Sequence, residues 1–455
     1  MPVNSRHPLY EASHHRWSMC NDLFQGQDAM IDAGTKYVPQ LLGQNNEQYQ
    51  YYIQRGEFFD AFFRTIQGLV DSVFRKQIAV SAPEKVNDKL SSITDSGQSF
   101  AAFCAAVVRE IFKSGRCGVL IDYATEEPFV SLINTFSIIN WRSTFVNGEE
   151  ILSMVVLEDI TQKESEKDRF IFEKVTQIRT FELIDNQCIA TLYTKSEKDK
   201  DFIQQEPTVL NIHGKPIDFI PFVFLGSENN LSEPNKPPLL DLGYINIAHW
   251  RKTVDLNHGL HYTALPTPYA AGFDIRGDYT IGPVKVWVAK DPNAKAGYIE
   301  FSGEGLKTLM ESIKSNESQM AVLGARLIEK TRDKVETAET SKIRQSGETS
   351  ALTIMVNNIS IGLTEVIKIF AKWLMIEDKD ILVQLNTDFI ALQISPQQIT
   401  ALLQSLQQGA ISSDTFLYQM KIGEILPPGI SVDDEKKLIE SQKEEDFGYS
   451  DSDDI

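Results

Sequence analysis

Cysteine is scarce in this chain of 455 residues. The four cysteines, Cys20, Cys104, Cys117 and Cys188, are far apart and form no C-x-x-C pair. Structural zinc sites and disulfide frameworks need closely spaced or paired cysteines, so the sequence argues against both. We expect the four thiols to be reduced packing residues.

Motifs that mark common catalytic and cofactor sites are absent. The sequence contains no G-x-x-x-x-G-K-[ST], no H-E-x-x-H, no G-x-S-x-G and no G-x-G-x-x-G. Without the first, the chain lacks the usual cradle of backbone amides for a nucleoside triphosphate. We predict no catalytic residue, no cofactor and no enzyme; a hydrolase or nuclease with an unrecognised metal site is the alternative.

The histidines supply one candidate metal pair. On a helix, His258 and His261 would share a face and could hold a metal. Such sites usually need three or four ligands. We therefore predict no metal site and interpret these histidines as interface or surface residues.

Positive charge is in deficit. The chain has 44 Lys and Arg against 63 Asp and Glu, a net charge of −19. Affinity for phosphates depends on clustered Lys and Arg, which argues against a tight, sequence-specific DNA binder. A conduit through which a polyanion slides needs only weak attraction, and acidic walls suit it.

Long apolar runs are missing as well. No run approaches the roughly 20 residues that span a bilayer, and the N-terminus has no basic stretch leading into an apolar core. Hydrophobic residues make up 42% of the chain. We expect a soluble protein of about two to four structural units, without a membrane segment, that stays in the cytoplasm until assembly.

Apolar spacing predicts the elements of the first half of the chain. Residues 47–76 and Ser99–Lys113 have the three-and-four spacing of helices with one buried face, and Gly115 ends the second. Val119–Tyr123 reads as a buried strand. Short β-branched runs to about residue 225 predict an antiparallel sheet, with charged hairpin turns at 161–169 and 195–201.

Two long helices flanking a β-rich insert are predicted next. Prolines precede a helix that begins at Leu239 and ends near Leu265. The stretch 272–301 is rich in glycine and β-formers, and a second helix follows over Glu304–Lys330. A third apolar helix covers Glu348–Ile376.

The C-terminal part reads as a helical hairpin and a tail. Ser395 and Pro396 begin a helix that stops at Gly409, and Ser412 or Ser413 begins its partner, which ends near Gly423. From Ser431 to Ile455 the chain is acidic and is expected to be mobile. The tail is either a solubilising extension or a docking segment.

Basic residues gather between the second and third long helices: Lys330, Arg332, Lys334, Lys342 and Arg344. Acidic residues are interleaved with them, so a solvated helix face is the simpler interpretation. In a ring of subunits, however, each lysine would become a circle of charge that contacts phosphates transiently.

Several motifs resemble those of a family of tailed-bacteriophage portal proteins, and none of them is catalytic. They are His7-Pro8, Trp17, the run Ala33-Gly34-Thr35-Lys36-Tyr37-Val38-Pro39, a Tyr-rich helix from Tyr49 to Arg75 with Arg64-Thr65-Ile66-Gln67-Gly68, Ile281-Gly282-Pro283, Asp291–Gly297, Phe301-Ser302-Gly303, Leu323–Arg326, Glu336–Ala338, Asn386–Phe389 and Gly409–Phe416. Val38 stands where the family more often has Leu. The resemblance covers about residues 7–428.

The resemblance implies the α+β portal fold of wing, stem, clip and crown. The wing would be residues 1–230, the first stem helix 231–265, the clip 266–303 and the second stem helix 304–330. A tunnel loop at 331–347 would approach the channel, and 348–394 would hold a long helix and a return to the wing. The crown hairpin would be 395–428, followed by a disordered acidic tail at 429–455.

The resemblance also implies a function. About twelve copies would form a ring at one vertex of the capsid, through which double-stranded DNA enters and leaves without its bases being read. Its partners would be the terminase large subunit, the major capsid and scaffolding proteins and a head-tail adaptor, and it would reside in the virion. The five basic residues named above would be candidate DNA contacts. Another head-assembly or adaptor protein is the alternative.

Overall fold

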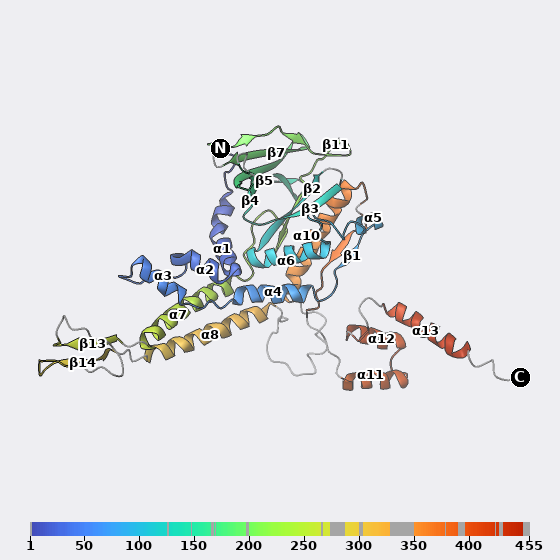
Figure 1. Ribbon diagram of the computed structural model, residues 1–455. Coiled ribbons are helices and arrows are strands. Elements are labelled where there is room, and N and C mark those ends of the chain that lie inside the picture. Colours follow the sequence, from blue (N-terminus) through green and yellow to red (C-terminus); the bar gives the residue numbers. More distant parts are fainter. Residues whose placement is uncertain are drawn as a thin grey trace. The chain divides into compact units, whose positions relative to one another are not determined.

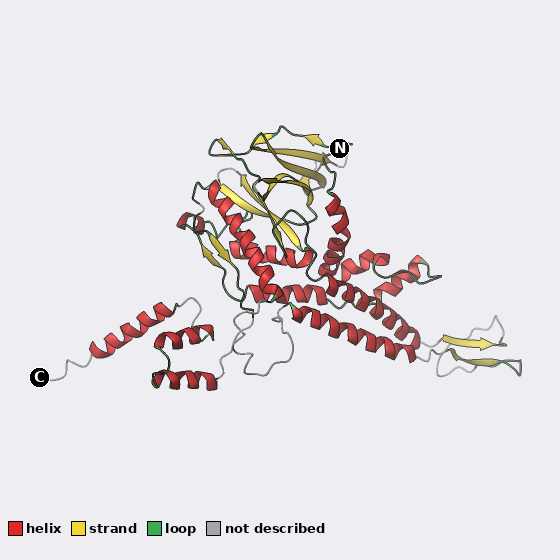
Figure 2. Cartoon of the chain, turned by 180° about the vertical axis from the view of Figure 1, so that it is seen from behind, coloured by secondary structure: helices red, strands yellow, loops and turns green. Residues whose placement is uncertain are grey.

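The chain forms two compact units, Met1–Thr387 and Asp388–Ile455. A computed structural model describes residues 2–124, 127–146, 148–164, 168, 170–196, 200–264, 267–273, 287–299, 304–327, 350–377, 379–389, 396–423, 425–426 and 431–448. Figures 1 and 2 show the chain from opposite sides. Its mixture of helices and sheets agrees with the predicted α+β class.

The N-terminal part of the first unit is helical. Its elements are α1 (Pro8–Gln25), α2 (Gln27–Ala33), the 3-10 turn η1 (Gly34–Lys36), α3 (Asn46–Gln54), α4 (Ala61–Val73) and, after strand β1 (Ala79–Ser81), the short α5 (Glu84–Asn87). The prediction of one helix over 47–76 is wrong, because α3 ends at Gln54 and α4 begins at Ala61. Asn246 interrupts the segment by accepting from the Phe62 N–H and donating to the Phe59 carbonyl.

A three-stranded sheet forms the centre of this unit. Helix α6 (Phe100–Ser114) is capped by Ser99 and ends at Gly115, which has a φ of 86°. The chain then enters β2 (Arg116–Ala124), which lies between β12 (Phe222–Gly226) and β3 (Glu127–Ile133). The predicted helix and the buried strand after it are confirmed.

Helix α10 (Ala351–Trp373) packs against this sheet. It begins at the N-cap Ser350, and strand β15 (Leu382–Gln384), which follows it, pairs with β1. Residues from the late part of the chain therefore lie against its first third (Figure 1).

Helix α10 is long and apolar enough to cross a bilayer, contrary to the sequence estimate that no such segment exists. Its environment is that of a core helix, because one face packs against β12, β2 and β15. Val356, Leu363, Val366 and Phe370 on that face are buried.

A second, larger antiparallel sheet has the strand order β4-β5-β6-β7-β8, and β9 also pairs with β7. Its strands are β4 (Ile138–Val146), β5 (Glu149–Glu164), β6 (Phe172–Ile184), β7 (Gln187–Ser196), β8 (Ile203–Gln204) and β9 (Thr208–Val209), and β10 (Asn211–Ile212) and β11 (Lys215–Pro216) form a separate hairpin. The predicted turns at 161–169 and 195–201 start too early, because β5 and β7 continue into them. Opposite charges such as Lys163 and Glu173 stand across the β5–β6 pair and suit pairing.

Two long helices and a β hairpin leave this body together. Helix α7 (Leu240–Ala264) and helix α8 (Glu304–Arg326) are the two long helices predicted around the insert, and they lie side by side (Figures 1 and 2). The strands β13 (Thr267–Ala271) and β14 (Lys295–Ile299) pair at the end where α7 finishes and α8 begins.

The second unit contains α11 (Pro396–Gln407), α12 (Ser413–Ile422) and α13 (Val432–Gly448). Ser412 caps α12 by accepting from the Thr415 N–H at 3.1 Å. The first two helices are the predicted hairpin.

The prediction of a disordered acidic tail is wrong for Val432–Gly448, which forms helix α13. The Ser431 hydroxyl accepts a hydrogen bond from the Asp434 N–H at 3.0 Å and donates one to the Asp434 carboxylate. Acidic residues in the first turn stabilise the positive end of the helix dipole, and Lys436 pairs with Asp414 on α12 at 2.8 Å.

Candidate functional site: the base of the paired helices

Helices α7 and α8 run antiparallel. Lys252 of α7 donates to Ser312 at 2.7 Å and to Asn316 at 3.2 Å on α8. Further along α7, Gly259 packs so closely on Leu306 that a Cβ would lie 2.6 Å from Leu306 Cδ2. As residue numbers rise on α7, those of the partners fall on α8.

His249 joins the same pair of helices. Its Nε2 lies 3.4 Å from an oxygen of Glu317. Burial lowers the pKa of this histidine, and the hydrogen bond and charge of Glu317 oppose that shift without reversing it. The pair is therefore a hydrogen bond from a neutral imidazole at neutral pH rather than an ion pair.

The run Ala33–Pro39 fastens the N-terminal helices to α7. Asp22 on α1 accepts from both Lys36 Nζ and the Tyr37 hydroxyl, each at 2.6 Å. The Tyr37 carbonyl accepts a hydrogen bond from Arg251 of α7. Burial, followed by the bond to Asp22, raises the pKa of Tyr37. Asp22, Lys36, Tyr37 and Arg251 therefore form a structural clamp between α1 and α7.

Gly34 and Tyr49 complete this clamp. Gly34 has a φ of 51°, in the region that favours glycine, and a Cβ there would lie 3.6 Å from the Tyr49 hydroxyl. That hydroxyl donates to the Val38 carbonyl at 2.8 Å. The Tyr-rich helix α3 thereby holds the preceding run in place.

The end of α3 contacts the middle of α7. The Tyr52 hydroxyl donates to Asp255, and Arg55 Nη1 lies 3.1 Å from His258 Nδ1. Asn257 donates to the Arg55 carbonyl at 2.8 Å. Residues separated by about two hundred positions in sequence therefore meet along one side of α7.

The histidine pair considered as a metal site has other neighbours. His258 packs edge-on against Tyr52 and Tyr262, and His261 also contacts the Tyr262 ring. Burial and the nearby Arg55 lower the pKa of His258. Among the described residues no group of three or more His, Cys, Asp or Glu side chains is arranged to hold a metal.

Other motif segments contact one another near the same place. A Cβ on Gly324 of α8 would lie 3.2 Å from Thr65 Cγ2 of α4, so the two quoted motifs are packed together. Asn386 donates to the Ser72 carbonyl at the end of α4 at 3.2 Å. Three of the motifs, those around Thr65, Gly324 and Asn386, thus bring α4, α8 and the segment after β15 into contact.

A buried guanidinium lies where α1 meets the two sheets, and sequence reasoning missed it. Arg116, 1% exposed, lies over the rings of Trp141, Phe224 and Trp17 at 4.2, 5.2 and 5.6 Å. Its Nη1 donates to the Ser232 carbonyl at 2.7 Å, and its other two nitrogens have no hydrogen-bond partner among the described residues. Burial lowers its pKa to about 9, so it is charged at neutral pH.

His7, of the His7-Pro8 motif, belongs to the same cage of aromatic rings around Arg116. Its imidazole stacks on Trp141 at 4.1 Å, and its Nδ1 accepts from the Leu9 N–H at 3.1 Å, which caps α1. Burial and the charge of Arg116 lower the pKa of His7. The sequence signal for the cage was the quoted His7 and Trp17; nothing in the sequence pointed to Arg116.

The predicted DNA contacts Lys330, Arg332, Lys334, Lys342 and Arg344 lie outside the described residues. The assignment of these residues to a channel stays a prediction. Part of the predicted clip, 274–286, also lies outside them.

Comparisons with known proteins place one match on the paired helices. A family model described as a domain of unknown function (DUF4055) matches residues 238–374, a range that begins just before α7 and includes α8 and α10. No curated protein matches the sequence.

Solved structures of gene transfer agent (GTA) particles show a distant likeness. A chain in the virion of the native particle is 12% identical with a TM-score of 0.39, covering 88% of this chain and 98% of that one. A chain in the neck of the native particle, computed with C12 symmetry, is 12% identical with a TM-score of 0.40, covering 88% and 99%.

Proposed function

We propose that this chain is a portal-type protein of a tailed-phage particle, forming a ring of about twelve subunits that serves as a channel for double-stranded DNA. The observation that supports it most is the antiparallel pair α7–α8, which ends in a β hairpin and is clamped at its base by the motifs of the family resemblance. A rigid pair of helices projecting from a mixed body is the part that a channel wall requires.

In this proposal α7 and α8 are the stem and the β13–β14 hairpin belongs to the clip. The N-terminal helices and both sheets are the wing, and α11 and α12 are the crown. The clip would receive the terminase large subunit during packaging and a head-tail adaptor afterwards, while the wing would face capsid and scaffolding proteins. The protein would act without catalysis, in the virion.

Exposed apolar residues on α8 suit contact with a neighbouring subunit. Met310 and Val322 of α8 are 46% and 49% exposed, although α8 packs along α7. Large interfaces between subunits bury such residues.

Electron microscopy of negatively stained protein and native mass spectrometry test the proposal. Wild-type protein should give rings with a central channel, and Val322→Asp should weaken them. Leu42→Asp, in an exposed loop, is the matched control and should leave them intact. A compact monomer at high concentration and beside its assembly partners would overturn the proposal.

The channel assignment has a separate test. Replacing Lys330, Arg332 and Lys334 with Ala should leave rings intact and change packaging or retention of DNA, because transient phosphate contacts are lost. Unchanged packaged length and retention would reject the tunnel assignment while leaving the ring proposal standing.

A further inference from the structure

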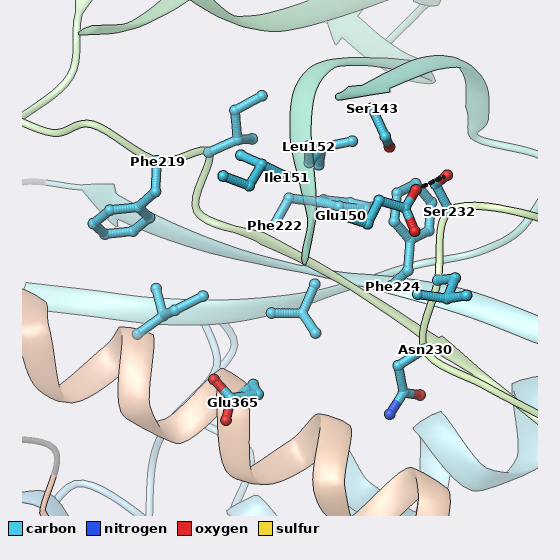
Figure 3. Close-up of a pocket in the computed structure, with 14 residues that line it drawn as sticks. Ser143, Glu150, Ile151, Leu152, Phe219, Phe222, Phe224, Asn230, Ser232 and Glu365 are labelled. Atoms are coloured by element: carbon cyan, nitrogen blue, oxygen red, sulfur yellow. Dashed lines mark hydrogen bonds between the residues drawn. The ribbon is translucent and has the colours of Figure 1, made fainter. Parts of the chain in front are cut away.

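A cavity of about 480 Å³ lies where the two sheets and α10 meet. Its walls come from β4 and β5, from β12, from the segment Asn230–Ser232 and from α10 (Figure 3). Its size falls within the range of pockets that hold small ligands or short peptide segments. None of the motifs discussed above accounts for it.

The edge of β12 faces this cavity. Phe222, Val223 and Phe224 all line it. Because successive side chains of a strand point to opposite faces, a cavity touched by three consecutive residues runs along the edge of the strand. In the described sheet β12 pairs with β2 alone, so this edge is free of any strand.

The hydrogen-bond pattern shows which backbone groups face outward. The Ile121 N–H donates to the Pro221 carbonyl at 2.8 Å, and alternation then directs the groups of Val223 toward β2 and those of Phe224 and Gly226 outward. Gly226 is satisfied by side chains, since its N–H donates to Asn230 at 3.2 Å and its carbonyl accepts from Asn358 at 2.9 Å. Within the described part of the chain the Phe224 N–H and carbonyl have no hydrogen-bond partner, so both are available for another strand.

A second strand edge faces the same cavity. Glu150, Ile151 and Leu152 are consecutive residues of β5 and all line it. The pairing of β6 with β5 starts only at Met154, so among the described residues no strand pairs with 150–152 on that side. The cavity is therefore bordered by two lengths of strand that, in the described sheets, are each paired on one side only.

The charge of the lining is acidic. Among the described residues, Glu150 and Glu365 are the only ionisable side chains that line it. Glu150 accepts the Ser232 hydroxyl (Figure 3), and Glu365 is paired with Lys368 at 2.7 Å on its own helix. Phe222 supplies aromatic surface beside these carboxylates, whereas the rings of Phe219 and Phe224 already lie against Lys372 and Arg116. A carboxylate next to an aromatic ring attracts a cation on an apolar stem.

We propose that this cleft binds an extended segment of a partner protein by strand addition, in which apolar residues alternate with Lys or Arg. The segment would hydrogen bond to the free edge of β12 and place a basic side chain beside Glu150, in the mode by which exposed sheet edges capture peptides. This proposal concerns the cleft alone and does not depend on ring formation or on a DNA channel.

Methyl NMR of the full-length chain labelled at isoleucine tests it, because Ile151, Ile220 and Ile369 line the cleft. The probe is a capped peptide of about eight residues that alternates valine with lysine and threonine. Its addition should shift these three methyl signals and leave that of Ile160 unchanged. Glu150→Gln should weaken the affinity about tenfold.

Two matched variants on β5 separate the cleft from the rest of the sheet. Ile151 is 39% exposed and lines the cleft, whereas Ile160 is 64% exposed and does not. Ile151→Lys, which puts a cation into the cleft, should weaken peptide binding at least tenfold, and Ile160→Lys should leave it unchanged. Both positions tolerate a long polar side chain, so loss of folding is not expected.

Matched peptides decide how the segment binds. A peptide with N-methylated backbone amides should fail, and equal binding by it would overturn strand addition. Equal binding by a peptide with glutamate in place of lysine, or equal shifts with butylamine alone, would overturn the peptide assignment. No shift with the lysine peptide at about 1 mM would also overturn it. If the peptide instead dissociates copies of this chain, as seen by sedimentation, the occupant is a second copy and not a partner protein.

Discussion

Gly56 lies so close to Val254 that a Cβ on the glycine would stand 2.4 Å from Val254 Cγ2. It would also lie 3.1 Å from Trp250 Nε1, on the same helix α7. This contact brings the segment between α3 and α4 against α7.

We predict that Gly56→Ala destabilises the protein by about 1–3 kcal/mol, because the added methyl group overpacks this contact. Gly68→Ala is the matched control. It lies in helix α4 with nothing within 4 Å of its Cβ position, so the change should stabilise by up to about 1 kcal/mol. Urea denaturation measures both, and equal effects at the two positions would contradict the packing argument.

A second prediction concerns Asp22, which accepts from Lys36 and Tyr37. Asp22→Asn removes the negative charge and replaces one carboxylate oxygen with an amide group that donates instead of accepting. We expect it to lower the free energy of unfolding by about 1–2 kcal/mol. Asp28→Asn, at an exposed position on α2, should change stability by less than about 0.5 kcal/mol. Thermal unfolding of the three proteins at neutral pH gives the comparison; a cost at Asp28 as large as at Asp22 would be evidence against the clamp.

Stability should fall at alkaline pH because of buried tyrosines. Burial and hydrogen bonds to Asp22 and Asp255 raise the pKa values of Tyr37 and Tyr52 above the ordinary value of 10.0. The unfolded chain therefore loses these protons first, and the stabilisation, complete below about pH 10, is lost as pH rises further. Tyr52→Phe should flatten the decline measured by urea unfolding between about pH 9 and 11, and the exposed Tyr51→Phe should not.

The loss of stability at acid pH should depend on His249. Burial lowers its pKa below the ordinary value of 6.5, so the unfolded chain binds this proton more readily. Stability due to the neutral imidazole is present above pH 6.5 and is lost as pH falls below it, by at most about 1.4 kcal/mol per pH unit. His249→Gln should reduce this slope. An unchanged slope between pH 7 and 5 would show that other groups, such as His7, His14 and His258, account for it.

Replacement of Arg116 should distinguish shape from charge. Arg116→Lys keeps a buried cation but loses the guanidinium that lies over the Trp141 ring, and we expect it to destabilise by about 2–3 kcal/mol. Arg116→Met removes the charge from an apolar cage and should cost less than Arg116→Lys, because the lysine ammonium must still be desolvated and the methionine side chain carries no charge. The midpoint of urea unfolding ranks the two; a larger cost for Met would mean that the cation itself stabilises the cage.

Local patterns in the sequence were enough for several helices. Ser99 and Gly115 bound α6, Ser412 caps α12, and prolines precede α7, because caps and breakers act through the backbone of their own neighbours. The pattern also predicted two long helices around a β-rich insert. It did not predict α1, whose cap is a histidine, and it placed the ends of β5 and β7 too early.

Contacts between distant segments decided the rest. Asn246 breaks what reads locally as one helix over 47–76, since it supplies hydrogen bonds that the backbone of Phe59 and Phe62 would otherwise make within a helix. The cage around Arg116 and the free edges beside Glu150 arise from strands far apart in sequence. Apolar spacing and helix caps depend on residues within about one helical turn, so the sequence by itself determined where most helices and strands form. Only tertiary packing determined which strand edges stay unpaired beside Glu150 and that the charge of Arg116 is buried among aromatic rings.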